Sequence, residues 1–268
     1  MRTVRIVVYL VFTLATAGWA HDLFLRPESL FVAPNSDVRV RVLNGTFSES
    51  ENSISWDRIR DLRVITATGF SHPDSNSWEE AGTMSTLSFR TGEEGTYVVA
   101  LSTRPREFRL EAAEFNEYLR TDGIPDILAA RKRSGELDRA ARERYSKHVK
   151  AVLQAGQLRT GGFQTVLRYP AELVPLENPY SLKIGSTLRV RTLVEGEPVA
   201  NQYVLSGGRA PDGDVIAEKS TRSDVAGIAR VPLTSRGHWY VKFIHMTATP
   251  GDSVDYESKW ATLTFEAR

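Results

Sequence analysis

The feature that most constrains the fold is a series of short segments in which apolar and polar residues alternate. In one of them, Val38, Val40 and Val42 lie on one face of the chain. Arg39 and Arg41 lie on the other face. Side chains that alternate in this way belong to a strand with one buried and one solvent-exposed face. The sequence therefore predicts a mainly β fold.

These strand-like segments fall into two groups along the chain. The first group is 22–27, 30–32, 37–43, 63–68, 85–90 and 96–101, and the second is 187–194, 198–205, 215–219, 228–233, 238–246 and 260–265. Short strands separated by turn residues are typical of antiparallel sandwiches. We therefore expect two immunoglobulin-like β-sandwich domains, at 21–155 and 170–268, joined by a linker at 156–169.

Between the two groups the apolar periodicity changes to three and four residues. This spacing predicts a helix at 112–119 and a second helix from Ile124, where Pro125 suits the first turn. It also predicts a longer helix at 136–154. The apolar positions of that longer helix are Leu137, Ala141, Tyr145, Val149 and Val152. We therefore expect a helical insert over 111–155, between the two sandwiches.

Residues 1–20 have the layout of a secretory signal peptide. A start with two arginines precedes an apolar run, and Gly18 and Ala20 are small residues at three and one positions before a cut. Cleavage after Ala20 would make His21 the first residue of a periplasmic or secreted protein. No later apolar run approaches the roughly 20 residues of a membrane-spanning helix, so we expect no retained transmembrane helix.

The composition argues against several classes of function. The chain has 34 basic and 33 acidic residues, which does not suggest a nucleic-acid-binding surface. It has no cysteine, which removes thiolate metal sites, cysteine nucleophiles and iron–sulfur clusters. It also lacks the G-x-S-x-G and H-E-x-x-H motifs and the glycine-rich nucleotide loops. A metal ion would therefore be held by histidine, carboxylate, methionine or backbone groups.

A histidine at the first position of a mature chain offers a metal ion two nitrogens at once, the α-amine and the ring Nδ1. The α-amine has an ordinary pKa near ~7.7–8.0, so part of it is unprotonated at neutral pH. His21 is therefore the first candidate metal ligand. The alternative is that His21 is incidental, because some residue must follow every cleavage site.

His245 is the second candidate ligand. Successive side chains of a strand alternate between its faces, and His238 and His245 are seven residues apart. His245 then shares a face with Val241 and Phe243, whereas His238 lies on the opposite face. An unpaired polar group at the rim of an apolar face costs about 1–3 kcal/mol. A metal ion could satisfy the ring of His245, and so could a hydrogen bond to a backbone carbonyl.

Three further residues could support such a site. Asp255 and Glu257 have the parity of the inward face of the last strand and could bind the metal or orient a ligating imidazole. The alternative is a solvated turn before that strand. His148 lies at the margin of the predicted helix at 136–154, where a hydrogen-bonded histidine at the core edge is favoured over a metal ligand.

Five stretches of this sequence together resemble one family: 20–27, 143–150, 172–180, 238–246 and 255–265. It is the exported family of unknown function that includes the periplasmic NikM-like components of nickel and cobalt uptake systems. The resemblance implies two β-rich, immunoglobulin-like domains and a metal-related role for the first residues after processing. By motif match it assigns ligands to His21 and His245. It also implies a membrane component, here a separate membrane metal permease.

From these observations we expect a periplasmic protein that binds a transition-metal ion (nickel, cobalt or copper) and serves its uptake or handling, with no enzymatic activity. Two alternatives stay open. One is a metal-free envelope module that binds a partner. The other is a copper redox enzyme with a histidine brace built on the same pair of histidines.

The predicted processing can be tested directly. We expect intact-mass and N-terminal peptide analysis of the exported protein to give His21 as the first residue, because the small residues at 18 and 20 suit the signal peptidase. A mature chain that begins at any other residue would remove the amine ligand from the hypothesis.

Overall fold

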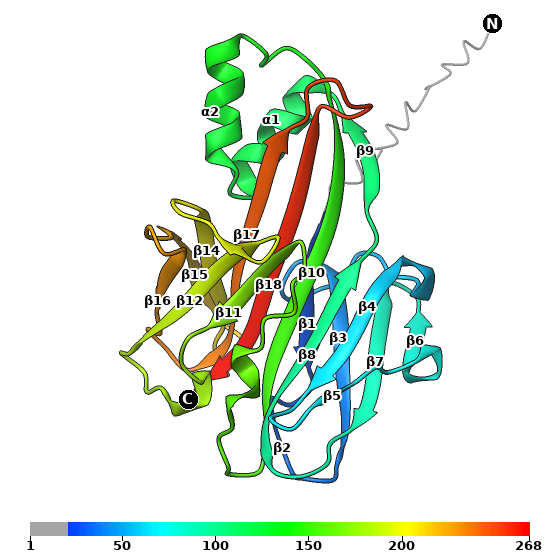
Figure 1. Cartoon of the computed structure of the whole chain (residues 1–268), viewed down its shortest axis with the longest axis vertical. Helices are drawn as coiled ribbons and strands as arrows, with labels where there is room; N and C mark the ends of the chain where they lie inside the picture. Colours follow the sequence, from blue (N-terminus) through cyan, green and yellow to red (C-terminus); the bar gives the residue numbers. More distant parts are fainter. Residues whose placement is uncertain (1–20) are drawn as a thin grey trace, which may run out of the picture.

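A computed structural model describes residues 21–268, and the predicted signal peptide at 1–20 lies outside this described part. The described chain is mainly β, with several sheets and two α-helices, which confirms the predicted fold class (Figure 1). No helix of the described residues is long and apolar enough to cross a membrane.

The strands of the described chain form three sheets. The N-terminal sheet has the order β1 (Asp22–Pro27), β3 (Asp37–Gly45), β7 (Met84–Arg90) and β6 (Trp78–Ala81). The large sheet has the order β15 (Val215–Arg222), β14 (Tyr203–Arg209), β17 (Gly237–Ala248), β18 (Tyr256–Ala267), β10 (Ala141–Ala155), β8 (Gly95–Thr103), β4 (Ile59–Ile65) and β5 (Phe70–Ser71). β2 (Phe31–Val32) and β9 (Arg106–Leu110) also pair with β10. The third sheet contains β11 (Ala171–Pro175), β12 (Thr187–Val194), β13 (Glu197–Pro198) and β16 (Ile228–Pro232).

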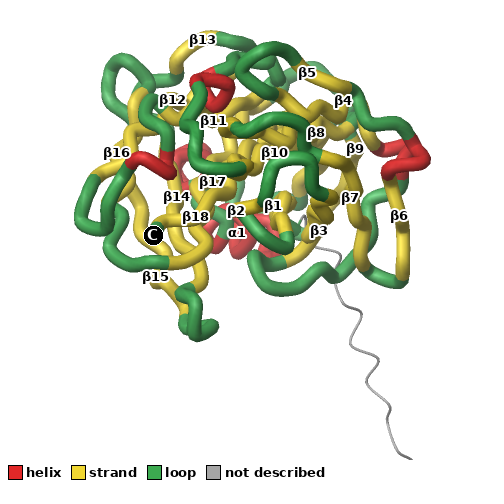
Figure 2. The backbone as a smooth tube through the Cα atoms, turned by 90° about the horizontal axis from the view of Figure 1, so that it is seen from below, coloured by secondary structure: helices red, strands yellow, loops and turns green. Residues whose placement is uncertain are grey.

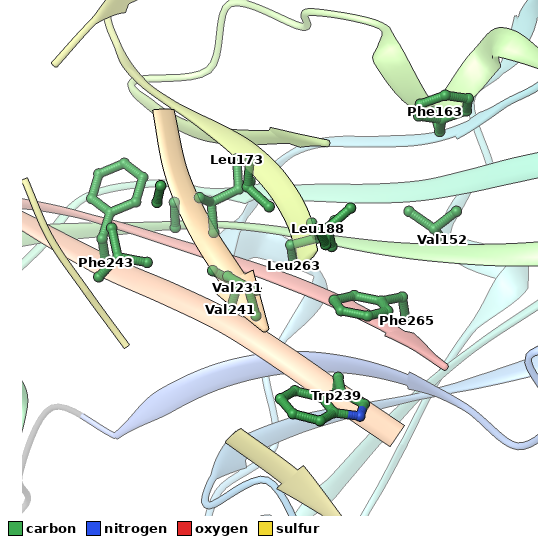
Figure 3. Packing of buried hydrophobic residues seen from close by; sticks show 14 of the residues in the cluster. Val152, Phe163, Leu173, Leu188, Val231, Trp239, Val241, Phe243, Leu263 and Phe265 are labelled. Carbon is green, nitrogen blue, oxygen red and sulfur yellow. The ribbon is translucent and has the colours of Figure 1, made fainter. Parts of the chain in front are cut away.

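The central strands of the large sheet are buried on both faces. On β8, Val99 and Leu101 belong to the core shared with the N-terminal sheet. Val98 and Ala100, which alternate with them, belong to the core shared with the third sheet. Figure 3 shows part of that second core, where side chains of the large sheet pack against those of the third sheet. In Figure 2, where the molecule is seen from below, β10 lies near the middle, with β12 and β16 of the third sheet on one side and β7 and β6 of the N-terminal sheet on the other.

The helix predicted at 136–154 is wrong, because this segment contains the strand β10 (Ala141–Ala155). Two features of the strand produced the helical signal. Ala141, Tyr145 and Val149 are four residues apart, and an even spacing also keeps side chains on one face of a strand. In addition, β10 is buried on both faces, so apolar residues such as Val152 interrupt the alternation that identifies a half-buried strand.

The other two predicted helices are confirmed. They are α1 (Ala112–Thr121) and α2 (Pro125–Ser134), and they form the helical insert at one end of the molecule (Figure 1). Phe115 and Tyr118 of α1 are buried against the large sheet, where Tyr118 stacks on Trp260 of β18 at a centroid distance of 6.0 Å. α1 therefore covers the part of this sheet face that the N-terminal sheet leaves free.

The two predicted domains share the large sheet. β10 belongs to the first segment and β18 to the second, and the two strands pair in parallel, from Glu143 opposite Tyr256 to Ala151 opposite Thr264. The domain boundary at 156–169 stays a prediction. Within this stretch, Phe163 is buried in the core between the large sheet and the third sheet.

A buried ion pair joins β11 to β10. The Nζ atom of Lys150 lies 2.5 Å from Oε1 of Glu172, and both side chains are almost fully buried. The Glu172 carboxylate also accepts hydrogen bonds from the backbone N–H groups of Leu167 and Arg168, at 2.7 and 3.1 Å. A buried carboxylate with this many donors depends on all of them, because it has no access to water.

We expect Lys150→Met to destabilise the protein by about 3–5 kcal/mol, because it leaves the Glu172 carboxylate buried without its counter-ion. Urea unfolding followed by circular dichroism measures this. The double variant Lys150→Met/Glu172→Gln should recover part of the loss. As a control, Arg90→Met breaks an exposed pair with Asp37 and should leave the free energy of unfolding nearly unchanged. If Lys150→Met and Arg90→Met lower the free energy of unfolding equally, the Lys150–Glu172 pair does not have the proposed role.

Candidate functional site

A pocket of about 360 Å³ lies at the start of β1 and contains His21. Four parts of the chain form it: the first residues of β1, the loop after β3 with Glu51, the end of α1 with Asp122, and β17 with Tyr240. We call it the His21 pocket. It lies on the face of the large sheet that α1 and the N-terminal sheet cover.

The start of β1 is held in place by the large sheet. The carbonyl oxygen of His21 accepts a hydrogen bond from Nζ of Lys147 on β10, and the same Nζ donates to Oδ1 of Asn44 at 3.0 Å. The next residue, Asp22, forms an ion pair with Lys242 of β17 at 2.6 Å. His21 therefore occupies a defined position, although it immediately precedes the first strand.

The imidazole of His21 faces a carboxylate. Its Nε2 lies 3.3 Å from Oε2 of Glu51, and the side chain of His21 is only 21% exposed. An ionised carboxylate has no proton to donate, so at this distance it favours the neutral tautomer of His21 that carries its proton on Nε2. The lone pair of Nδ1 is then available to another partner.

Several charged groups surround this position. Burial, together with the negative charge of Asp22, raises the pKa of Asp122 to about 7. Burial lowers the pKa of Lys147 to about 7. Burial acts in the same direction on Lys242, but Asp22 and Glu218 outweigh it and raise the pKa of Lys242 above its ordinary value. At neutral pH, small changes in charge near the pocket therefore change the protonation of Asp122 and Lys147.

A buried carboxyl group lies behind the pocket on β10. Oε1 of Glu143 accepts hydrogen bonds from the hydroxyl groups of Tyr118, at 3.1 Å, and Ser258. Its Oε2 has no hydrogen-bond partner within residues 21–268. Burial raises the pKa of Glu143 to about 8, so the group holds its proton at neutral pH.

His245 does not share the His21 pocket. As predicted, it lies on the face of β17 that carries Val241 and Phe243, both of which belong to the core under the third sheet. Lys242, three residues before it, points to the opposite face and binds Asp22. The Nδ1 of His245 lies 2.9 Å from Oε1 of Gln202, in a separate pocket near the start of α2. The two histidines thus lie on opposite faces of one sheet.

His148 is satisfied by two hydroxyl groups. It lies on β10 rather than on a helix, with Nδ1 2.9 Å from Oγ of Ser102 and Nε2 3.0 Å from Oγ of Ser146. Burial lowers the pKa of His148 to about 3, so the ring is neutral. Both nitrogens already have partners, in agreement with the hydrogen-bonded histidine that the sequence favoured over a ligand.

Asp255 and Glu257 line neither the His21 pocket nor the pocket that contains His245. Oδ2 of Asp255 accepts a hydrogen bond from the backbone N–H of Arg142 at 2.7 Å, and Glu257 lies 3.8 Å from the ammonium group of Lys259. Across the described chain, no group of three or more His, Asp or Glu side chains is arranged to hold a metal ion. The His21 pocket has three acidic side chains, Asp22, Glu51 and Asp122, whereas the pocket that contains His245 has one, Asp126.

Sequence reasoning missed Glu51, Asp122, Lys147 and Lys242. Glu51 and Asp122 lie in loops that show no periodicity, so no local signal identified them. The two lysines carried a usable signal. Lys242 lies between Val241 and Phe243, and Lys147 shares its strand face with Tyr145 and Val149. A charge in such a position is paired when it is buried. Lys147 and Lys242 point to the start of β1 because the N-terminal sheet covers the face of the large sheet on which they lie.

The family DUF4198, described as a domain of unknown function, matches residues 18–247. No curated protein matches the chain. Among solved structures, it is similar to trypsin activated alpha-2-macroglobulin from Escherichia coli, with 10% identity and a TM-score of 0.24. That similarity covers 92% of this chain but only 16% of the other, and at this TM-score it carries no argument about fold or function.

We expect a distinct pH dependence from Glu143. Its pKa is about 8 in the folded protein against an ordinary value of 4.5, so the folded state holds an extra proton between these values. Stability therefore falls as the pH rises from about 4.5 to 8, by up to about 1.4 kcal/mol per pH unit. The variant Glu143→Gln removes this titration, so its stability relative to wild type should increase over the same range.

Urea unfolding at several pH values measures this difference. Glu197→Gln is the matched control, because Glu197 is an exposed glutamate on β13 and its variant should follow the wild-type profile. A Glu143→Gln profile parallel to that of the wild type would show that Glu143 does not hold the extra proton.

Proposed function

This chain belongs to the DUF4198 family, and on that basis we propose that it is a periplasmic protein that binds a transition-metal ion at His21. The ion is nickel, cobalt or copper, and the protein serves its uptake or handling. The single observation that carries the proposal is the contact of 3.3 Å between Nε2 of His21 and Oε2 of Glu51.

This contact puts a carboxylate beside the ring nitrogen that would stay protonated in a metal-binding histidine. A ligating imidazole usually donates its second N–H to a carboxylate or carbonyl, which fixes the tautomer and the orientation of the ring. With the proton on Nε2, the free nitrogen of His21 is Nδ1, and this is the ring nitrogen that can bind an ion together with the α-amine of the same residue. Glu51 then acts as the orienting carboxylate.

The proposal depends on processing after Ala20, which would turn the backbone nitrogen of His21 into an amine. The amine and Nδ1 would supply two nitrogen ligands, and copper and nickel are the divalent ions with the highest affinity for such donors. Asp122 and Tyr240 line the same pocket and could supply oxygen ligands. Because the hydrogen bonds to Lys147 already hold the carbonyl of His21, the chelating residue needs little further ordering.

The geometry supports a site built on His21 without His245. The second candidate ligand lies on the opposite face of the large sheet, hydrogen-bonded to Gln202. An ion shared by these two histidines, and with it a copper histidine brace, has no support from their positions. In a role in uptake, the protein would transfer its ion to a membrane metal permease, a partner that the family resemblance suggests.

Metal titration of the mature protein tests the proposal. We expect His21→Ala to weaken Cu(II) and Ni(II) binding at least about tenfold, because it removes the ring nitrogen of the chelate. Glu51→Gln should weaken binding by about 10- to 100-fold, since the amide no longer enforces the Nε2–H tautomer. Isothermal titration calorimetry gives the affinities, and electron paramagnetic resonance of the Cu(II) form reports the nitrogen ligands.

Two controls make the result specific. A chain with one extra residue before His21 keeps every side chain but displaces the amine, and it should lose affinity as His21→Ala does. His245→Ala should bind both metals as the wild type does. If His21→Ala and the extended chain bind with unchanged affinity, the proposed site is wrong. If His245→Ala alone loses affinity, the ligands lie on the other face of the sheet.

A further inference from the structure

A second and larger pocket, of about 540 Å³, lies at the far end of β1. Its lining includes Arg26 of β1, Arg209 of β14, His238 of β17 and Glu266 of β18. We call it the Arg26 pocket. The aromatic cluster of Phe24, Phe47 and Tyr240, with centroid distances of 4.9–5.2 Å, packs between β1, the loop after β3 and β17.

The two arginines of this pocket lack acidic partners. Within residues 21–268, neither Arg26 nor Arg209 forms an ion pair with a carboxylate, whereas most other half-buried charges of this protein do. Both side chains are instead held by neutral groups. Nη1 of Arg26 donates to the carbonyl of Phe47 at 3.1 Å, and Nε of Arg209 donates to Oγ of Ser48 at 2.8 Å.

These neutral contacts fix the guanidinium groups without neutralising them. Arg209 also donates through Nη1 to the carbonyl of Gly213 at 3.1 Å. A guanidinium carries five N–H donors, so each of the two arginines keeps donors beyond these contacts. Phe47 and Ser48, two consecutive residues of one loop, thus hold two like charges at the same pocket. Each positive charge raises the free energy of keeping the other group charged.

The remaining lining does not cancel this charge. The carboxylate of Glu266 lies 2.8 Å from Nε of Arg268 and 3.8 Å from Nε2 of His238, so it has partners of its own. Burial lowers the pKa of Arg26, and the charges of Arg41 and Arg209 lower it further. The pocket therefore has an excess of positive charge that is partly shielded from water.

The backbone holds Arg209 and His238 opposite each other. They are direct partners in the antiparallel register of β14 and β17. Glycines on both strands make this close approach possible, because a Cβ at Gly208 would lie 2.1 Å from the carbonyl oxygen of His238. A Cβ at Gly237 would lie 2.2 Å from the carbonyl oxygen of Arg209. The paired strands therefore fix the backbone positions of these two residues.

We propose that the Arg26 pocket binds a small ligand through an oxyanionic group, a phosphate or a carboxylate, held between the guanidinium groups of Arg26 and Arg209. Planar guanidinium groups match the oxygens of such anions and form strong charge-assisted hydrogen bonds with them. His238 lies at the wall of the pocket and provides a further N–H donor when it is protonated. This inference does not depend on metal binding at His21.

Anion titration of the metal-free protein tests this inference, with inorganic phosphate and malonate as the two probes. We expect saturable binding of at least one of them. Two-dimensional NMR spectra measure it through the chemical-shift changes of the backbone amides around residues 47–48 and 209. Arg209→Gln should weaken binding at least about tenfold, because it removes one of the two charges. The matched control is Arg230→Gln, an exposed arginine on β16 outside the pocket, which should bind as the wild type does.

Each outcome of this titration decides the question. Tighter binding of phosphate supports a phosphate-bearing ligand, and tighter binding of malonate supports a carboxylate-bearing one. If neither probe saturates, or if Arg209→Gln and Arg230→Gln bind equally, the inference is overturned. Arg26→Gln serves as the second test should Arg209→Gln fail to fold. His21→Ala should keep its anion affinity, so this test and the metal titration can fail independently.

Discussion

The burial of β10 on both of its faces is the constraint on which the rest of this structure depends. One face of the strand lies under the N-terminal sheet and α1, and the other lies under the third sheet. Apart from Arg142 and Arg144 near its start, the strand has no solvent-exposed position for a charge. Each buried ionisable side chain that it carries must therefore find a partner inside the protein or change its protonation.

The buried charged residues of β10 satisfy this requirement in three ways. Lys150 forms a buried ion pair with Glu172 and thereby attaches β11 of the third sheet to the large sheet. Glu143 holds its proton, since its pKa is raised to about 8. Lys147 donates to the carbonyl of His21 and fixes the start of β1. The position of the candidate metal ligand is thus a consequence of how a buried lysine is satisfied.

The His21 pocket and the Arg26 pocket lie at opposite ends of β1 and have opposite chemistry. The first contains carboxyl groups around a histidine, and the second contains two guanidinium groups without acidic partners. Both use the loop after β3, which supplies Glu51 to one and the acceptors of Phe47 and Ser48 to the other. One loop therefore connects a site suited to a cation with a site suited to an anion.

The sequence by itself determined the β class, most strand positions, the two short helices and the faces of β17, because these follow from periodicity along a single element. It also singled out His21. Only the tertiary structure decided that the segment of 136–154 contains a strand, because a doubly buried strand loses its alternation and even spacings suit both helix and strand. It also decided that His245 and His21 lie apart. Parity assigns a side chain to one face of its own strand, but the sheet that packs on that face is set by long-range pairing, and no local pattern records it.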